Sequence, residues 1–242
     1  MFASFIPMST EHWPGKISFV VLFSGSDFRC GFYNSKFIEF KNEYQADIKE
    51  IKKEIEKNIS FIEAITFTGG DPCLQKPSLI ELLRFSRKLK LKTSVHTNGT
   101  KPLCLGNMLN SKLVDYLILN LNAPLQEDIF EKVNKARTFF RPTDVVIHEI
   151  RQSLNYLREA NINIEIRTKI VPGLIYRKED ILAIASEIKN IDCTWVLEQF
   201  KPEPGLVDKK LENISPPTLK FMENLRETIL KEHNIKVEIK GE

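Results

Sequence analysis

The chain has 242 residues, 42% of them hydrophobic, which suits one large domain or two small ones with a sizeable core. It carries 35 basic and 32 acidic side chains, and the net charge of +3 is too small to indicate binding to nucleic acid or to a membrane surface. The apolar run at 17–23 is far shorter than the ~20 residues that span a bilayer, so no membrane segment is expected.

The cysteines indicate a reducing environment. Cys30, Cys73, Cys104 and Cys193 are widely and irregularly spaced, and they form neither a disulfide framework nor a Cys-x-x-Cys pair. The first ten residues lack the basic region of a secretory signal. These features together predict a cytoplasmic protein.

Short apolar runs alternate with stretches of helical periodicity along the chain. The run at 17–23 is nearly continuously apolar, as is typical of a strand covered on both faces. Ile48, Ile51 and Ile55 then form one stripe of a helix. Further strands are predicted at 63–68, 92–96, 115–121, 162–171, 194–200 and 236–239. Further helices are predicted at 77–89, with a capping box from Ser78 to Glu81, and at 102–109, 144–160, 178–189 and 218–233, whereas 126–142 is predicted to be a polar segment.

Six or seven such repeats predict a parallel sheet covered by helices. Because no Gly-x-Gly-x-x-Gly motif is present, we expect a partial (β/α)6 barrel of the TIM type, in a single domain over 1–242, and not a Rossmann sheet. Ligands of such barrels bind at the C-terminal ends of the strands. Those ends are predicted at 24–33, 69–73, 96–99, 120–124, 171–173 and 199–202.

The strand at 63–68 leads directly into Gly69, Gly70, Asp71 and Pro72. Two adjacent glycines let the backbone approach a ligand with no Cβ in the way, and Asp71 places a carboxylate beside them. The same pattern, taken alone, is equally compatible with a tight turn from a strand to a helix.

Several short motifs follow one another along the chain. They are Trp13-Pro14-Gly15-Lys16, Thr68-Gly69-Gly70 with Pro72, Thr97-Asn98-Gly99, Asp115-Tyr116 with Ala123-Pro124, Arg167-Thr168, Val171-Pro172-Gly173-Leu174 and Gln199-Phe200-Lys201-Pro202. Taken in this order, they resemble the radical S-adenosylmethionine (SAM) superfamily, and most closely the glycyl-radical activating enzymes, in particular the activating proteins of anaerobic ribonucleoside-triphosphate reductase. The resemblance extends from about residue 9 to residue 239. It implies that SAM binds at Gly69, Gly70, Asp71, His96, Asn98, Asn120, Arg167 and Pro172.

The same resemblance implies a 4Fe–4S cluster held by a Cys-x-x-x-Cys-x-x-Cys loop, here at 24–36. The sequence Asp27-Phe28-Arg29-Cys30 sets the register, so the three ligand positions hold Ser26, Cys30 and Tyr33. One thiolate is too few for a cluster that normally takes three or four. Cys73, next to the Gly-Gly turn, is the further candidate for a metal ligand, and it could lie beside Cys30, whereas Cys104 and Cys193 are expected away from that rim.

Other departures from the family lie at the predicted cavity. Asp71 replaces a Glu, His96 and His12 each replace an acid, and Asn120-Leu121-Asn122 stands where relatives have Asp-x-Lys. Since the glycines, prolines and strands of the barrel are kept, we interpret the chain as a radical SAM fold without the cluster, with a role in binding a small molecule or a partner. Two alternatives stay open: an active enzyme whose unusual cluster is completed by a partner, and a subunit complexed with a reductase or an active homologue.

Five side chains have more than one interpretation. His12 and His96 could form a proton-transfer pair or bind a metal, although a histidine at a strand end is more often a hydrogen-bonded structural residue. Arg167 could bind a carboxylate or phosphate, or pair with Glu149 or Glu165. Glu198 and Gln199 are neighbours on one strand, so only one of them can face the inside of the barrel.

Overall fold

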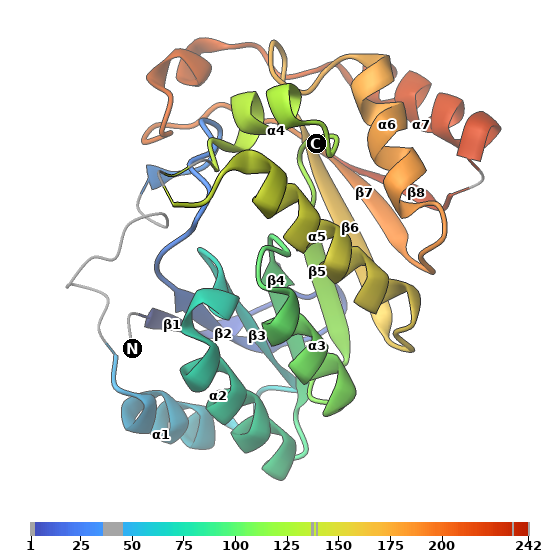
Figure 1. Cartoon of the computed structure of the whole chain (residues 1–242). Coiled ribbons are helices and arrows are strands. Elements are labelled where there is room, and N and C mark those ends of the chain that lie inside the picture. Colours follow the sequence, from blue (N-terminus) through green and yellow to red (C-terminus); the bar gives the residue numbers. More distant parts are fainter. Residues whose placement is uncertain (1–2, 36–45, 137, 139, 234, 242) are drawn as a thin grey trace.

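The computed structural model of the chain describes residues 3–35, 46–136, 138, 140–233 and 235–241. They form one eight-stranded sheet in the order β1 to β8. The strands are β1 (Ala3–Ser9), β2 (Ser18–Phe23), β3 (Ala64–Gly69), β4 (Lys92–Thr97), β5 (Tyr116–Asn120), β6 (Asn163–Ile170), β7 (Thr194–Gln199) and β8 (Val237–Lys240). β1 is antiparallel to β2, and every later pair is parallel. The sheet ends at β1 and β8, as expected for a partial barrel (Figure 1).

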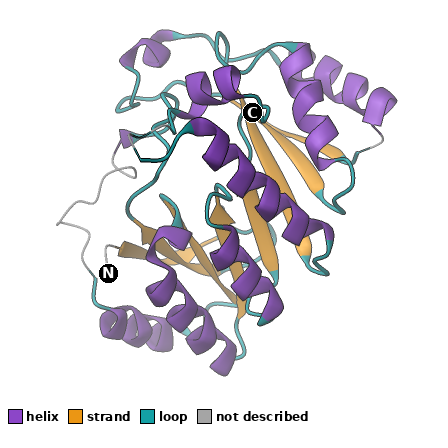
Figure 2. Ribbon diagram, viewed as in Figure 1, coloured by secondary structure: helices purple, strands orange, loops and turns teal. Residues whose placement is uncertain are grey.

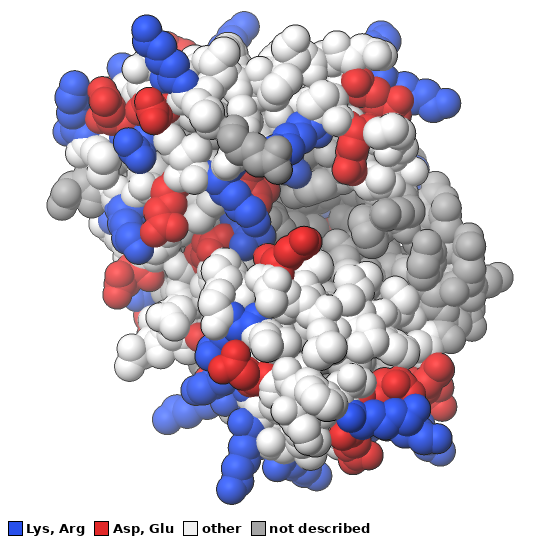
Figure 3. All heavy atoms as spheres, turned by 180° about the vertical axis from the view of Figure 1, so that it is seen from behind, with Lys and Arg blue, Asp and Glu red and all other residues white. Residues whose placement is uncertain are grey.

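Helices connect the parallel strands and cover the outer face of the curved sheet (Figure 2). They are α1 (Ile48–Asn58), α2 (Lys76–Lys88), α3 (Pro102–Asn110), α4 (Glu127–Asn134), α5 (Thr143–Arg158), α6 (Lys178–Ile188) and α7 (Leu219–His233), with short 3₁₀ helices η3 (Pro72–Gln75) and η4 (Lys209–Asn213). None of these described helices is both long and apolar enough to cross a membrane. Basic and acidic side chains are interspersed on the face seen in Figure 3, in keeping with the small net charge.

The two faces of the sheet differ in polarity because side chains alternate along each strand. On β3, Ile65 and Phe67 are fully buried in the apolar core. Thr66 lies between them and points the opposite way, where its hydroxyl accepts a 3.0 Å hydrogen bond from Ser94 on β4. The inner face is therefore polar at this pair of strands, and the apolar core lies between the sheet and the helices.

The structure corrects three expectations about secondary structure. β1 was not predicted, and it pairs with β2 while Phe5 stacks on Phe19 at 5.4 Å. α4 lies in the segment predicted to be polar, where Ile129, Phe130 and Val133 supply a short apolar stripe. The predicted capping box is wrong because α2 begins before Ser78 and has no side-chain cap, so the preceding turn belongs to η3.

Candidate functional site

A cavity of about 210 Å³ lies at the C-terminal ends of the central strands. It is lined by Ser26, Phe28, Tyr33, Asn34, Thr68, Gly69, Gly70, His96, Asn98, Asn120, Asn122, Arg167 and Glu198. Six of the eight predicted cofactor-binding residues thus line one cavity, and Asp71 and Pro172 are the two that do not. The parallel sheet brings them together because its strands all end at the same edge.

The Gly-Gly turn is packed tightly against the end of β2. Gly69 has a φ of +105°, and a Cβ added there would lie 2.3 Å from the carbonyl oxygen of Phe23. The N–H of Gly70 donates a 2.7 Å hydrogen bond to the same oxygen. The close approach of β2 thus requires glycine at position 69, quite apart from any ligand.

The carboxylate of Asp71 is buried and acts as a structural acceptor. It accepts hydrogen bonds from the backbone N–H of Cys73 at 2.8 Å and of Asn98 at 3.0 Å, and from the hydroxyl of Thr97. Burial, and then the nearby charge of Asp27, raise its pKa to about 6. Asp71 therefore caps η3 and joins the end of β3 to the end of β4.

His96 is the most buried titratable side chain among those that line the cavity. Its Nδ1 lies 3.0 Å from the hydroxyl of Thr68, and its buried Nε2 has no hydrogen-bond partner among the described residues. Burial lowers its pKa well below the usual value; the charges of Arg167 and His12 act in the same direction, and the backbone of His12 weakly opposes them. The imidazole is therefore neutral at pH 7. His12 bonds instead to Ser9 at 2.8 Å, and no hydrogen bond between the two rings occurs in the described part of the chain.

Arg167 both faces the cavity and forms ion pairs. Its Nε donates to Glu165, and its Nη1 lies 3.7 Å from Glu198. The prediction that Arg167 could pair with Glu149 is wrong, because Glu149 forms its ion pair with Arg141. As expected for neighbours on a strand, Glu198 faces the cavity whereas Gln199 points away and donates to the carbonyl of Pro217 at 2.7 Å.

The three positions aligned with cluster ligands have different environments. Ser26 lines the cavity, and its hydroxyl accepts a 3.1 Å hydrogen bond from the N–H of Phe28. Tyr33 also lines it and accepts a 2.9 Å bond from Asn122, while burial raises the pKa of its hydroxyl. Cys30 does not line the cavity; its fully buried thiol donates to Asn134 at 3.5 Å, and burial raises its pKa to about 12.

The other thiols lie elsewhere. Cys73 is buried beside Cys104 at the start of α3, and the contact with Cys104 together with burial raises its pKa well above the usual value. Cys104 was expected away from this rim, so the contact between Cys73 and Cys104 was not predicted. Half-buried Cys193 precedes β7. Within the described ranges, no group of three His, Cys, Asp or Glu side chains is placed to hold a metal ion.

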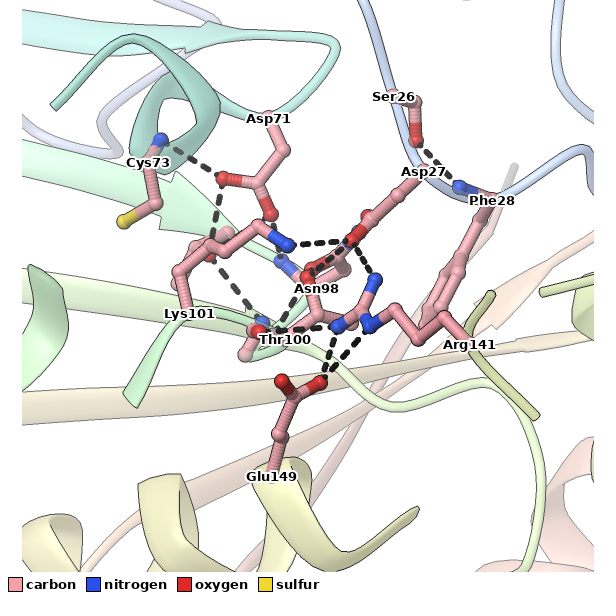
Figure 4. Close-up of polar contacts among 12 residues, drawn as sticks. Ser26, Asp27, Phe28, Asp71, Cys73, Asn98, Thr100, Lys101, Arg141 and Glu149 are labelled. Atoms are coloured by element: carbon pink, nitrogen blue, oxygen red, sulfur yellow. Dashed lines mark hydrogen bonds and ion pairs between the residues drawn. The ribbon is translucent and has the colours of Figure 1, made fainter. Parts of the chain in front are cut away.

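A charged network holds the loop that contains Ser26 and Cys30 (Figure 4). The carboxylate of Asp27 accepts hydrogen bonds from Asn98 at 2.8 Å, Thr100 at 2.7 Å and Arg141 at 2.6 Å, and it lies 3.2 Å from the ammonium of Lys101. Burial opposes ionisation, but the hydrogen bonds from Thr100, Arg141 and Asn98 outweigh it and lower the pKa of Asp27. No sequence pattern indicated this role of Asp27, because its partners come from distant elements.

Comparison with known proteins places this geometry in a family. The family model of the radical SAM superfamily matches residues 20–188. The chain therefore belongs to the radical SAM superfamily, whose members bind SAM and a 4Fe–4S cluster.

Individual relatives agree with that assignment. A protein of Methanocaldococcus jannaschii, provisionally named a glycyl-radical enzyme activating enzyme, is 27% identical over 213 residues, which are 88% of this chain and 84% of that protein. Among solved structures, a radical SAM methyltransferase from Sphaerobacter thermophilus superposes with a TM-score of 0.72 at 14% identity, over 94% of this chain and 67% of that one. Streptococcus suis SuiB bound to SAM gives a TM-score of 0.66 at 18% identity, over 90% of this chain and 48% of SuiB.

Proposed function

We propose that this protein is related to the activating proteins of anaerobic ribonucleotide reductase, has lost the ligands of the 4Fe–4S cluster, and binds a small polar molecule without radical chemistry. The observation that carries the proposal is the donor set of the cluster loop. It offers the hydroxyl of Ser26, the phenol of Tyr33 and a thiol on Cys30 that is buried against Asn134.

This donor set does not suit iron. Clusters are held by thiolates, and a thiol with a pKa of about 12 is protonated near neutral pH. The phenol of Tyr33 is still less acidic than usual because it is buried. The loop that carries Cys30 is also held by packing, since Phe28 lies edge-on against Phe130 of α4 at 5.7 Å between ring centroids. For Cys30 to reach iron, the loop would have to move away from this contact.

The cavity remains suited to a small ligand. Its volume of about 210 Å³ is below the ~300–1,000 Å³ of sites for drug-sized ligands, so bound SAM would require the site to widen. Its walls combine carboxamides, an imidazole and one Arg–Glu pair, which offer both donors and acceptors. We therefore propose that the mouth of the barrel binds this molecule.

The test is metal and sulfide analysis of the full chain, prepared without oxygen and reconstituted with iron and sulfide. We expect far less than one iron per chain and no reductive cleavage of SAM. A content of about four iron and four sulfide per chain, with cleavage of SAM, would overturn the proposal. Cys73→Ser removes the other candidate thiol. It is expected to leave the metal content unchanged, because Cys73 lies against Cys104.

A further inference from the structure

Three side chains that line the cavity have polar atoms without a hydrogen bond to any described residue. Nε2 of His96 is buried and has no hydrogen-bond partner, and no hydrogen bond to the carboxamide of Asn120 occurs among the described residues. The carboxylate of Glu198 forms ion pairs with Arg167 and Lys169 but no hydrogen bond. By contrast, Asn122 is fully engaged, since it donates to Tyr33 and accepts from the backbone N–H of Lys169 at 2.8 Å. Unused groups that converge on one cavity indicate a ligand that completes them.

Glu198 sets the charge of that ligand. Arg167 and Lys169 lie 3.7 and 3.9 Å from its carboxylate, which balances the charge but is too far for hydrogen bonds. Its two oxygens can therefore accept from N–H groups of a ligand. Arg167 and Lys169 already balance the charges of Glu165 and Glu198, so a third cation would gain no net attraction, and the donors belong to an uncharged molecule.

His96 and Asn120 determine the rest of the recognised surface. The imidazole is only 8% exposed, and its Nε2 either donates or accepts depending on the proton at Nδ1 beside Thr68. The amide of Asn120 does both. The ligand therefore carries acceptors as well as donors.

Size and shape come from the walls. At ~30 Å³ for each water, a volume of about 210 Å³ corresponds to roughly seven waters, or a molecule of about ten heavy atoms. The rings of Phe28 and Tyr33 line the same cavity and supply flat apolar surface. A planar ring system matches both features.

We infer that the cavity binds an uncharged, planar nitrogen heterocycle of nucleobase size, whose edge presents two adjacent N–H donors to Glu198, as the amino-oxo edge of guanine does. His96 and Asn120 bind the ring's remaining nitrogen and oxygen atoms. This inference rests on the proposed function, because a cluster with its cofactor would occupy the same mouth.

Calorimetric titration of the full chain tests it, with 9-methylguanine and 9-methylhypoxanthine as the probes. The second lacks only the amino group, so it offers Glu198 one donor in place of two. We expect 9-methylguanine to bind at least tenfold more tightly, because the hypoxanthine leaves a buried acceptor unpaired.

The matched variants are Glu198→Gln and Glu238→Gln. The first replaces one acceptor oxygen by a donor and is expected to weaken 9-methylguanine binding at least tenfold and abolish the preference. Glu238, on β8, pairs with Lys236 at the surface and is not part of the cavity, so its variant should bind like the unaltered chain. If thermal melting shows that Glu198→Gln does not fold, Asn120→Leu takes its place, with at least a tenfold loss of binding expected.

Equal binding of the two probes, no binding of 9-methylguanine at millimolar concentration, or an unchanged preference in the folded Glu198→Gln variant would overturn the inference. Its failure is distinguishable from that of the proposed function. Failure of the inference would be seen in titrations of metal-free protein, whereas failure of the proposed function would be seen in the iron and sulfide content.

Discussion

Asp27 accepts a 2.6 Å hydrogen bond from Arg141, which lies 114 residues further along the chain. The same guanidinium binds Glu149 on α5 and donates to the backbone oxygen of Thr100 at 3.1 Å. One cation thus joins the loop after β2, the loop after β4 and helix α5. Both loops contribute residues to the wall of the cavity.

Arg141→Met should destabilise the chain by about 2 kcal/mol, because it leaves the largely buried carboxylate of Asp27 with fewer partners. Chemical denaturation measures this loss. The matched control is Arg151→Met: Arg151 pairs with Glu187 at 3.0 Å but is 51% exposed, so its removal should cost less than about 1 kcal/mol. Equal losses in the two variants would show that the network contributes no more than a surface ion pair.

The close contact at the Gly-Gly turn gives a second prediction. Gly69→Ala places a Cβ 2.3 Å from a backbone oxygen at a positive φ, so we expect a loss of about 3 kcal/mol or more. Gly173→Ala is the control, since Gly173 also has a positive φ of +80° but has no atom within 4 Å of the added Cβ. It should cost only about 1 kcal/mol. Similar melting temperatures for the two variants would contradict the role assigned to the contact with β2.

The sequence predicted the parallel strands and the residues at their ends better than it predicted contacts between distant segments. Gly69, His96, Asn120 and Arg167 were found because the resemblance to the radical SAM superfamily indicates these positions, and the structure places all four at one cavity. The orientation of Asp71 was not predictable, because its carboxylate accepts a hydrogen bond from the backbone N–H of Asn98, in the loop after β4. Only the folded sheet places that loop beside Asp71. β1 and α4 were missed because neither has a long periodic pattern. β1 is defined by its pairing with β2, and α4 by its packing on the loop at 24–35.

Stability should fall with acid in a way that depends on His96. Its pKa is lowered in the folded state, so below pH ~6.5 the unfolded chain takes up a proton that the folded chain does not. The free energy of unfolding therefore decreases as the pH falls through that value. His96→Gln removes this contribution, and its stability should change less than that of the unaltered chain between pH 7.5 and 5. Parallel pH profiles of the two proteins would be the contrary result.

Asp71 has the opposite effect. Its pKa is raised to about 6 in the folded state, so the folded chain binds the proton more tightly than the unfolded chain, whose value is near 3.8. This contribution is fully present below pH ~4 and is lost as the pH rises through 6. Asp71→Asn should therefore remove a stabilisation that grows with acid, measured as the difference in unfolding free energy between pH 7 and 4.5. A variant whose pH profile matches that of the unaltered chain would show that Asp71 does not titrate in this range.

Restoring thiols should restore iron binding if the register of the cluster loop is correct. The double variant Ser26→Cys with Tyr33→Cys provides three thiols. To turn toward the cavity, Cys30 has to give up its 3.5 Å bond to Asn134, and its loop has to shift against Phe130. We expect iron and sulfide uptake in the double variant after anaerobic reconstitution, and none in Ser26→Cys or Tyr33→Cys alone, because two thiolates do not hold the cluster. Uptake by a single variant would show that another residue supplies a ligand. A folded double variant without iron would show that packing of the loop against α4, and not only the two substitutions, prevents assembly.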